Sequence, residues 1–216
     1  MDILKSNSCL IKHRPLKRLF DIVLSLLALT FGMPIFSLIA ILVMITSPGS
    51  PVYAQRRVGR GGKLFWCYKF RTMYGGADQL LKNMLETNPQ FKSEWESSFK
   101  LKNDPRITPF GHFLRKTSLD ELPQLWNVLK GDLSIVGPRP VIEQEIVEYY
   151  KDKSGKILSV RPGLTGLWQI SGRSDIKDYQ TRINLDERYV DNQSFWLDLK
   201  VIVKTVPAVF LSKGAY

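Results

Sequence analysis

A long apolar segment near the start of the chain dominates its hydrophobic pattern. The sequence has no charged residue from Ile22 to Ile45, and a helix of about 24 such residues is long enough to cross a bilayer. Pro34 interrupts the segment because it lacks a backbone N–H and its ring clashes with the preceding turn, and Gly32 weakens the same place. We therefore expect a helical half on either side of this break, each rising about 15 Å, roughly half the hydrocarbon thickness.

Cationic residues flank both ends of the apolar segment. Two precede it and four follow it: Lys17 and Arg18, then Arg56, Arg57, Arg60 and Lys63. Since Lys and Arg favour the cytoplasmic side of a membrane, this distribution predicts a segment that enters the membrane, bends at Gly32 and Pro34, and leaves by the same face. A kinked helix that spans the membrane and a helix buried in a soluble core are the alternatives. The length of the segment and the lack of a small-residue cleavage site disfavour a signal peptide.

The rest of the pattern predicts one globular domain. We expect a basic tail over residues 1–16, a membrane segment over 17–47 and the domain over 48–216. The domain opens with a β-hairpin, strands 52–58 and 64–73, joined by a glycine-rich turn. Helices are expected over 77–102 with a break at Pro89, over 111–116 and 122–129, and in an amphipathic stretch from 195 to 210, whereas 167–170 resembles a short strand.

The charge of the chain indicates an anionic partner. The formal net charge is +11, which suits nucleic acid, an anionic membrane surface or a phosphorylated substrate. The apolar segment favours the membrane and the phosphorylated substrate, because a nucleic-acid-binding protein would leave it unexplained. Cys9 and Cys67 have no spacing typical of a metal site, and they are expected to stay reduced in a cytosolic setting.

Two adjacent carboxylates, Asp120 and Glu121, mark the start of the helix expected over 122–129. Pro123 must lie in the first turn of that helix, which places Asp120 at or next to the N-cap. Capping is the commonest role of carboxylates there. Free backbone N–H groups at a helix start also stabilise an ionised carboxylate and hold phosphate. Asp120 is therefore also a candidate nucleophile towards phosphorus, with Arg115 about one turn upstream as a phosphate clamp.

Other cations are presented by regular elements. Lys69 and Arg71 fall on one face of the second hairpin strand by its two-residue period. Arg139 lies between two prolines in a stiff turn over 137–140, which lowers the entropy of presenting a guanidinium to phosphate. A solvated strand face and a purely structural turn remain the alternatives. Glycine-rich loops over 161–166 and 171–174 would allow close backbone approach to a ligand.

These runs together carry a resemblance. In order they are the proline-interrupted segment, Lys-Phe-Arg-Thr-Met at 69–73, Arg-Lys-Thr-Ser-Leu-Asp-Glu-Leu-Pro-Gln at 115–124, Gly-Pro-Arg-Pro at 137–140, Arg-Pro-Gly at 161–163 and Ser-Gly-Arg at 171–173. Over residues 15–216 the chain resembles the bacterial sugar transferase family, the monotopic phosphoglycosyl transferases. Met33 departs from the family, in which serine often precedes the proline, so the bend would depend on Gly32 and Pro34 alone.

The resemblance implies an activity and a set of site residues. A sugar 1-phosphate would pass from a UDP-sugar to undecaprenyl phosphate, with release of UMP, at the cytoplasmic face of the bacterial inner membrane. Asp120 would form a covalent phosphosugar intermediate, with Glu121 as its partner and Mg²⁺ bound at the pair. The implied phosphate contacts are Lys69, Arg71, Arg115 and Arg139, and the implied nucleotide-sugar contacts are Arg161, Gln169 and Arg173.

The resemblance also shapes the expected architecture. The fold class is α+β and mostly helical, with a re-entrant membrane helix hairpin, a small cytoplasmic catalytic domain containing the β-hairpin, and interfacial amphipathic helices. The chain before Ile22 is too short for the multi-span region of some relatives, and the final residues resemble members that transfer galactose or glucose 1-phosphate. Membrane lipid is an expected partner, nucleic acid is not, and a homodimer stays open. A membrane-anchored binding module without catalysis is the competing hypothesis.

Overall fold

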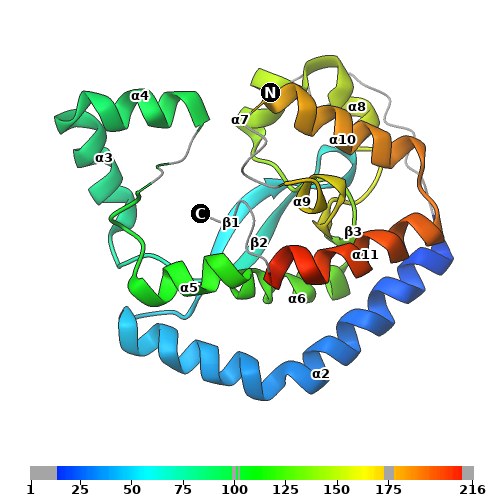
Figure 1. Cartoon of the computed structure of the whole chain (residues 1–216), viewed down its shortest axis with the longest axis horizontal. Helices are drawn as coiled ribbons and strands as arrows, with labels where there is room; N and C mark the ends of the chain where they lie inside the picture. Colours follow the sequence, from blue (N-terminus) through cyan, green and yellow to red (C-terminus); the bar gives the residue numbers. More distant parts are fainter. Residues whose placement is uncertain (1–13, 99–100, 102, 173–177, 211–216) are drawn as a thin grey trace.

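Most of the described chain is helical. The computed structural model describes residues 14–98, 101, 103–172 and 178–210. Two small two-stranded sheets, β1–β2 and β3–β4, lie among the helices, and the long helix α2 runs along one side of the molecule (Figure 1). The expected fold class, α+β and mostly helical, is confirmed.

The apolar segment forms one helix, α2 (Pro15–Thr46), with Pro34 inside it. The helix bends near its middle (Figure 1), as expected from Gly32 and Pro34, and it is continuous across the bend. A proline removes only one hydrogen bond from the ladder, so the turns on either side can continue and the helix kinks instead of ending. Gly32 leaves room for the ring of Phe36, because a Cβ at Gly32 would lie 2.9 Å from that ring.

Apolar side chains cover the exposed surface of α2. Among the described residues, α2 is the one helix long and apolar enough to cross a membrane, and only 11% of its most apolar window is buried. Its exposed apolar residues are Leu16, Leu19, Val23, Leu26, Leu27, Phe31, Met33, Ile35, Leu38, Ile41, Met44 and Ile45. A continuous apolar surface of this size indicates contact with lipid or with another protein.

Both ends of α2 are attached to the same domain. At the N-terminal end, Lys17 Nζ lies 2.7 Å from Asp198 Oδ2, and the guanidinium of Arg18 donates to the carbonyl of Val128 at 2.5 Å. At the C-terminal end, the Arg71 guanidinium donates to the carbonyl of Ser47. The helix therefore arches between two points of one folded unit.

The predicted β-hairpin is confirmed. β1 (Val52–Val58) pairs antiparallel with β2 (Leu64–Phe70), and the turn between them is the short helix η1 (Arg60–Gly62). The side chain of Asn127 holds the helix α6 (Gln124–Lys130) against this hairpin, since it donates to the Trp66 carbonyl at 2.6 Å and accepts from the Tyr68 N–H at 3.0 Å. Cys67 is buried in the core between these elements, as expected for a small packed side chain.

The middle of the chain follows the predicted helix pattern closely. The interruption before Pro89 separates α3 from α4, and Gly131 ends α6 with a φ of 90°, a conformation that glycine adopts without strain. The bounds of these elements are α3 (Ala77–Thr87), α4 (Pro89–Ser98), α5 (Pro109–Thr117), η2 (Leu119–Glu121) and α6 (Gln124–Lys130).

The predicted strand over 167–170 is wrong. These residues form the short helix α9 (Leu167–Ile170), and the strand is β4 (Gly163–Thr165), which pairs parallel with β3 (Ser134–Val136). A run of four apolar residues is too short for its periodicity to separate helix from strand. The glycines explain where the strand lies, because Cβ atoms at Gly137 and Gly163 would collide with each other's backbone.

Helices complete the C-terminal half. The predicted C-terminal helix is α11 (Phe195–Phe210); its Val201 is buried, whereas Phe195, Trp196 and Val203 are exposed. Phe195 stacks edge-on against Phe20 of α2 at 5.6 Å between ring centroids. The remaining elements are α7 (Glu143–Glu145), η3 (Ile146–Tyr150), η4 (Lys151–Lys153), α8 (Ser154–Ile157) and α10 (Tyr179–Asp191).

Candidate functional site

A large open cleft brings together most of the predicted site residues. Its volume is about 1920 Å³, and it lies between the end of β2, the α5–η2 turn, and helices α9 and α10. Residues far apart in the sequence meet there, seven of them predicted above: Lys69, Arg71, Arg115, Asp120, Glu121, Arg139 and Gln169. The cleft therefore combines two adjacent carboxylates with several cations.

Asp120 lies in a 3₁₀ turn. The sequence had instead predicted a position at or next to the N-cap of the following helix. The N-cap of α6 is Pro123, and Asp120 is the central residue of η2. The reason is Ser118, which ends α5 in the left-handed conformation with a φ of 56°. The chain then needs the η2 turn before a second helix can begin. Asp120 is only 8% exposed, so the turn presents a buried carboxylate to the cleft.

The surroundings of Asp120 raise the pKa of its carboxyl group towards neutral pH. Burial, helped by the charge of the neighbouring Glu121, raises the pKa of this carboxyl to about 6 against the opposing charges of Lys69 and Arg115. Lys69 Nζ lies 2.6 Å from Glu121 Oε1. Asp120 is therefore largely shielded from water, and the nearby cations Lys69 and Arg115 stabilise its ionised form.

Arg115 is oriented by its neighbours on the cleft wall. It lies in the last turn of α5, and its Nε donates to Thr72 Oγ1 at 3.0 Å. Burial lowers the pKa of this guanidinium, and the charges of Asp120 and Asp104 oppose that effect. A guanidinium remains charged in any case, so Arg115 presents a fixed positive charge beside Asp120.

Arg71 lines the cleft but its observed contact is with α2. Its guanidinium donates to the Ser47 carbonyl at the end of that helix, and a Cβ at Gly49 would also meet the guanidinium. The structure therefore shows Arg71 fastening the C-terminal end of α2 to β2, next to the site.

Arg139 belongs to a cationic and aromatic wall that sequence analysis missed. Its guanidinium lies 4.6 Å from the ring centroid of Trp168, and that of Arg182 lies 5.4 Å from the same ring. Arg182 also lies 4.8 Å from the centroid of Tyr179. No motif selected from the sequence includes Arg182, and α10 was not among the predicted helices; the fold alone brings Arg182 to Trp168.

Asp186 supports this wall from behind. The backbone N–H of Arg139 donates to Asp186 Oδ1 at 3.3 Å, and the hydroxyl of Tyr150 donates to Oδ2 at 3.1 Å. Burial raises the pKa of Asp186 to about 7. Nothing in the sequence distinguishes Asp186 from the other acidic residues of α10, Glu187 and Asp191.

The three predicted nucleotide-sugar contacts lie in different places. Gln169 lines the cleft, and its buried Oε1 has no hydrogen-bond partner among the described residues. Arg161 lies in a second, smaller pocket instead, where its Nε donates to the Gly131 carbonyl at 2.8 Å. Arg173 lies outside the described residues.

The carboxylates of the cleft could bind Mg²⁺ only if a bound ligand supplied further oxygen atoms to the metal ion. Within the described parts of the chain, no group of three or more His, Cys, Asp or Glu side chains could hold a metal ion. Asp120 and Glu121 offer hard carboxylate oxygens, and Mg²⁺ is commonly held by one or two carboxylates, substrate phosphates and water. The pair therefore fits a magnesium ion that arrives with a phosphorylated substrate.

Fold and site together show a cationic cleft with two adjacent carboxylates, attached to a long apolar helix. Comparison with known proteins identifies the family: the model of the bacterial sugar transferase family matches residues 12–212. The chain belongs to the bacterial sugar transferase family.

Several curated relatives are similar over almost the whole chain. One from Salmonella typhimurium, named undecaprenyl-phosphate galactose phosphotransferase, is 49% identical over 99% of this chain and 44% of its own length. One from Erwinia amylovora, named UDP-galactose-lipid carrier transferase, is 48% identical over 99% of this chain and 45% of its own length. The exopolysaccharide production protein ExoY of Sinorhizobium fredii is 49% identical over 93% of this chain and 88% of its own length. The chain thus spans less than half the length of the first two relatives.

Proposed function

We propose that the chain transfers a sugar 1-phosphate from a UDP-sugar to undecaprenyl phosphate and releases UMP. Support comes from the names of similar proteins, which include a galactose phosphotransferase and, at 38% identity, a UDP-glucose:undecaprenyl-phosphate glucose-1-phosphate transferase from Escherichia coli. UDP-galactose and UDP-glucose are therefore the first donors to test. The product would start the synthesis of a surface polysaccharide or glycoconjugate.

The observation that carries the mechanism is the buried Asp120 carboxylate in a cationic cleft. In the proposed first step, an Asp120 oxygen attacks the phosphorus that bears the sugar, and the bond from that phosphorus to the UMP oxygen breaks. UMP leaves with the bonding electron pair. In the second step, a phosphate oxygen of undecaprenyl phosphate attacks the same phosphorus and displaces Asp120, which restores the free carboxylate.

The neighbouring side chains would stabilise charge in both steps. Lys69 and Arg115 already act electrostatically on Asp120, and Arg139 lines the same cleft, so negative charge that develops on phosphate oxygens meets fixed cations. Asp120 and Glu121 would hold Mg²⁺, which would neutralise phosphate charge when bound. Glu121 would leave its ion pair with Lys69 to do so, which frees the Lys69 ammonium for a phosphate.

The attachment of α2 supports a re-entrant membrane helix. Both of its ends bind one folded domain, through Lys17 with Asp198 and through Arg71 with Ser47. A folded domain cannot be divided by a bilayer, so both ends would lie on one side while the apolar bend enters the membrane. Cations near both ends favour the cytoplasmic face of the bacterial inner membrane. The exposed Trp196 and Val203 would place α11 in the interface, because an apolar stripe on a surface helix favours the headgroup boundary.

A labelling experiment tests the covalent step. The chain with Mg²⁺ and a UDP-sugar labelled in the sugar should release about one UMP per site without any lipid acceptor, and the label should remain on Asp120. The Asp120→Asn variant should release none, whereas a matched Asp132→Asn variant, altered outside the cleft, should behave as the parent. UMP release only in the presence of lipid would indicate direct transfer. No release under any condition would favour a binding module without catalysis.

A further inference from the structure

A second pocket lies at the N-terminal end of α2, away from the cleft. Its walls come from the first turns of α2, the η1 turn, the start of β3, the segment around Arg161 and the end of α10. Among the described residues, none lines both this pocket and the cleft. The cavity is small, about 30 Å³, which is room for one small group and not for a nucleotide sugar.

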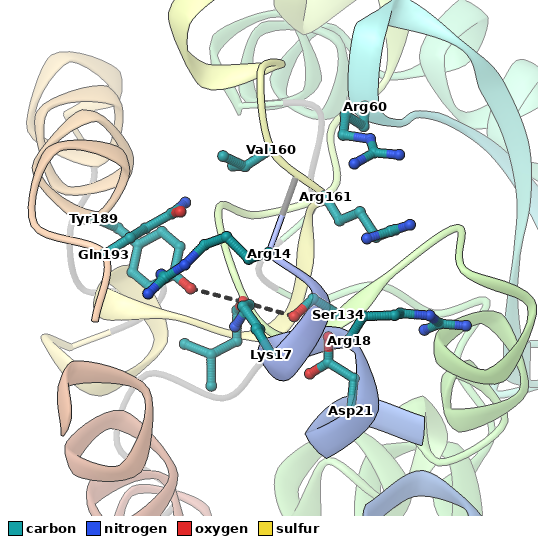
Figure 2. A pocket seen from close by; sticks show the side chains of 11 residues that line it. Arg14, Lys17, Arg18, Asp21, Arg60, Ser134, Val160, Arg161, Tyr189 and Gln193 are labelled. Atoms are coloured by element: carbon teal, nitrogen blue, oxygen red, sulfur yellow. Dashed lines mark hydrogen bonds between the residues drawn. The ribbon is translucent and has the colours of Figure 1, made fainter. Parts of the chain in front are cut away.

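The pocket is strongly cationic. Five of its lining residues are basic and one is acidic: Arg14, Lys17, Arg18, Arg60 and Arg161, against Asp21. Figure 2 shows Arg18, Arg60 and Arg161 extending to the same side of the pocket, with Arg14 across it beside Tyr189. Burial lowers the pKa of Arg161, and the positive charges of Arg60 and Arg18 lower it further. These like charges therefore lie close enough to repel one another. An anion between them would relieve that repulsion.

Part of this cluster has a structural explanation. Arg18 donates to the carbonyls of Val128 and Leu129 at 2.5 and 2.7 Å, and Arg161 donates to that of Gly131. These carbonyls end α6, where cations are stabilised by the helix dipole. The contacts account for some guanidinium N–H groups and hold both side chains rigid. They leave two other arginines of the pocket, Arg14 and Arg60, without an explanation.

One nitrogen of the Arg14 guanidinium, Nη1, is buried in this pocket without a hydrogen-bond partner among the described residues. Leaving a buried, charged donor unsatisfied is costly, and a phosphate oxygen would satisfy it. The acidic groups nearby are already engaged: Asp21 accepts from the Ile135 N–H at 3.0 Å, and Asp198 is paired with Lys17.

The position of the pocket along α2 identifies the source of the anion. The turns that supply Arg14, Lys17 and Arg18 also carry Leu16 and Leu19, which are 82% and 59% exposed. Apolar surface thus begins at the same level as the basic pocket. This is the arrangement expected at the boundary of hydrocarbon and headgroups, where basic side chains meet anionic lipid.

We propose that this pocket binds the phosphate group of an anionic phospholipid and fixes the start of α2 against the domain. Lipid phosphate would bridge Arg60 and Arg161 on one wall and reach Arg14 on the other. This pocket is separate from the cleft, so lipid binding here can be tested independently of the transfer reaction.

Native mass spectrometry of the full chain in neutral detergent micelles tests the site. Phosphatidylglycerol, phosphatidylcholine and inorganic phosphate are titrated separately, and retained ligand gives an apparent Kd for each. Phosphatidylglycerol should bind most tightly. Arg60→Gln and Arg14→Gln should each weaken it about tenfold, the loss expected for one charged hydrogen bond. The control Lys63→Gln removes an exposed charge directly after η1 that does not line the pocket, and it should leave the Kd unchanged.

Each alternative outcome would overturn the proposal. Equal weakening by Lys63→Gln would indicate diffuse attraction to surface charge. Binding of inorganic phosphate as tight as that of phosphatidylglycerol would indicate a site for soluble phosphate. Equal retention of phosphatidylcholine would indicate binding through the acyl chains. Arg60→Gln keeps the hydrogen bonds of Arg18 to the end of α6, so it remains informative if Arg14→Gln lowers the melting temperature.

Discussion

The ammonium group of Lys69 lies 2.6 Å from the carboxylate of Glu121, and this ion pair joins β2 to the turn that carries Asp120. Lys69 is also the cation with the largest influence against the raised pKa of Asp120. One lysine on the hairpin therefore regulates both carboxylates of the site. Its replacement should change the acidity of the neighbouring group as well as remove a phosphate contact.

Lys69→Met should shift the pH dependence of UMP release to higher pH. The proposed nucleophile is the ionised Asp120, whose pKa is about 6, so activity should fall as the pH falls through that value. Loss of the Lys69 charge raises the pKa of Asp120, and the acid limb should move in the same direction. The pH profile of single-turnover UMP release measures this, with Lys63→Met as the control. An unmoved acid limb in Lys69→Met would contradict the electrostatic role.

Asp120→Asn should stabilise the fold above pH 6 while it removes activity. The pKa of Asp120 rises from 3.8 to about 6 on folding, so its contribution to stability is present at low pH and is lost as the pH rises through about 6. Asparagine does not ionise, so the variant avoids the cost of a buried charge. Its free energy of unfolding should exceed that of the parent by about 1 to 3 kcal/mol at pH 8, and the difference should disappear by pH 4. Melting curves across this pH range, with metal chelated, measure the difference.

Asp178→Asn is the control for that experiment, because it should change the stability at pH 8 in the opposite direction. The side chain of Asp178 accepts from the hydroxyl of Thr181 and caps α10 by accepting from the N–H groups of Thr181 and Gln180, and these bonds lower its pKa. Its stabilisation is present at neutral pH and is lost as the pH falls through its depressed pKa. Asp178→Asn should therefore destabilise the fold at pH 8. A loss of stability in both variants would refute the proposed burial cost at Asp120.

Local patterns in the sequence were sufficient for much of the fold. The period-two pattern with a glycine-rich turn predicted the β1–β2 hairpin, and Gly131 predicted the end of α6. The apolar run predicted α2, because its length and lack of charge are properties of one continuous segment. Local patterns also selected six of the seven residues that meet in the cleft, whereas Gln169 and the role expected of each residue came from the resemblance.

Features that depend on contacts between distant segments could not be predicted. Arg182 gains its place only because α10 packs beside α9 and Trp168, and Arg71 turned out to bind the carbonyl of Ser47. Asp120 was placed at an N-cap because the positive φ of Ser118 has no sequence signal. Four residues over 167–170 carry too little periodicity to separate helix from strand.

Cysteine labelling should place the N-terminal segment and the domain on one side of the membrane. Cys9 is a natural probe, and Cys67 is buried in the core, so a second probe can be added at the exposed Lys151. A membrane-impermeant maleimide should label Cys9 and Lys151→Cys in inside-out vesicles and neither in right-side-out vesicles. Labelling of the two probes from opposite sides would establish a spanning helix and remove the re-entrant geometry.

Trp168→Leu should weaken binding of the UDP-sugar more than it slows chemistry. The guanidinium groups of Arg139 and Arg182 both contact the Trp168 ring, and loss of the ring removes the surface that positions both. A cation–π contact with a desolvated tryptophan is worth enough to raise KM about tenfold, with a small change in kcat. Trp168→Phe should restore most of the affinity because it keeps an aromatic face. Trp66→Leu is the matched control, since Arg56 covers the Trp66 ring at 5.4 Å outside the cleft. An equal rise in KM for both leucine variants, or a fall in kcat alone for Trp168→Leu, would show that this wall does not bind the donor.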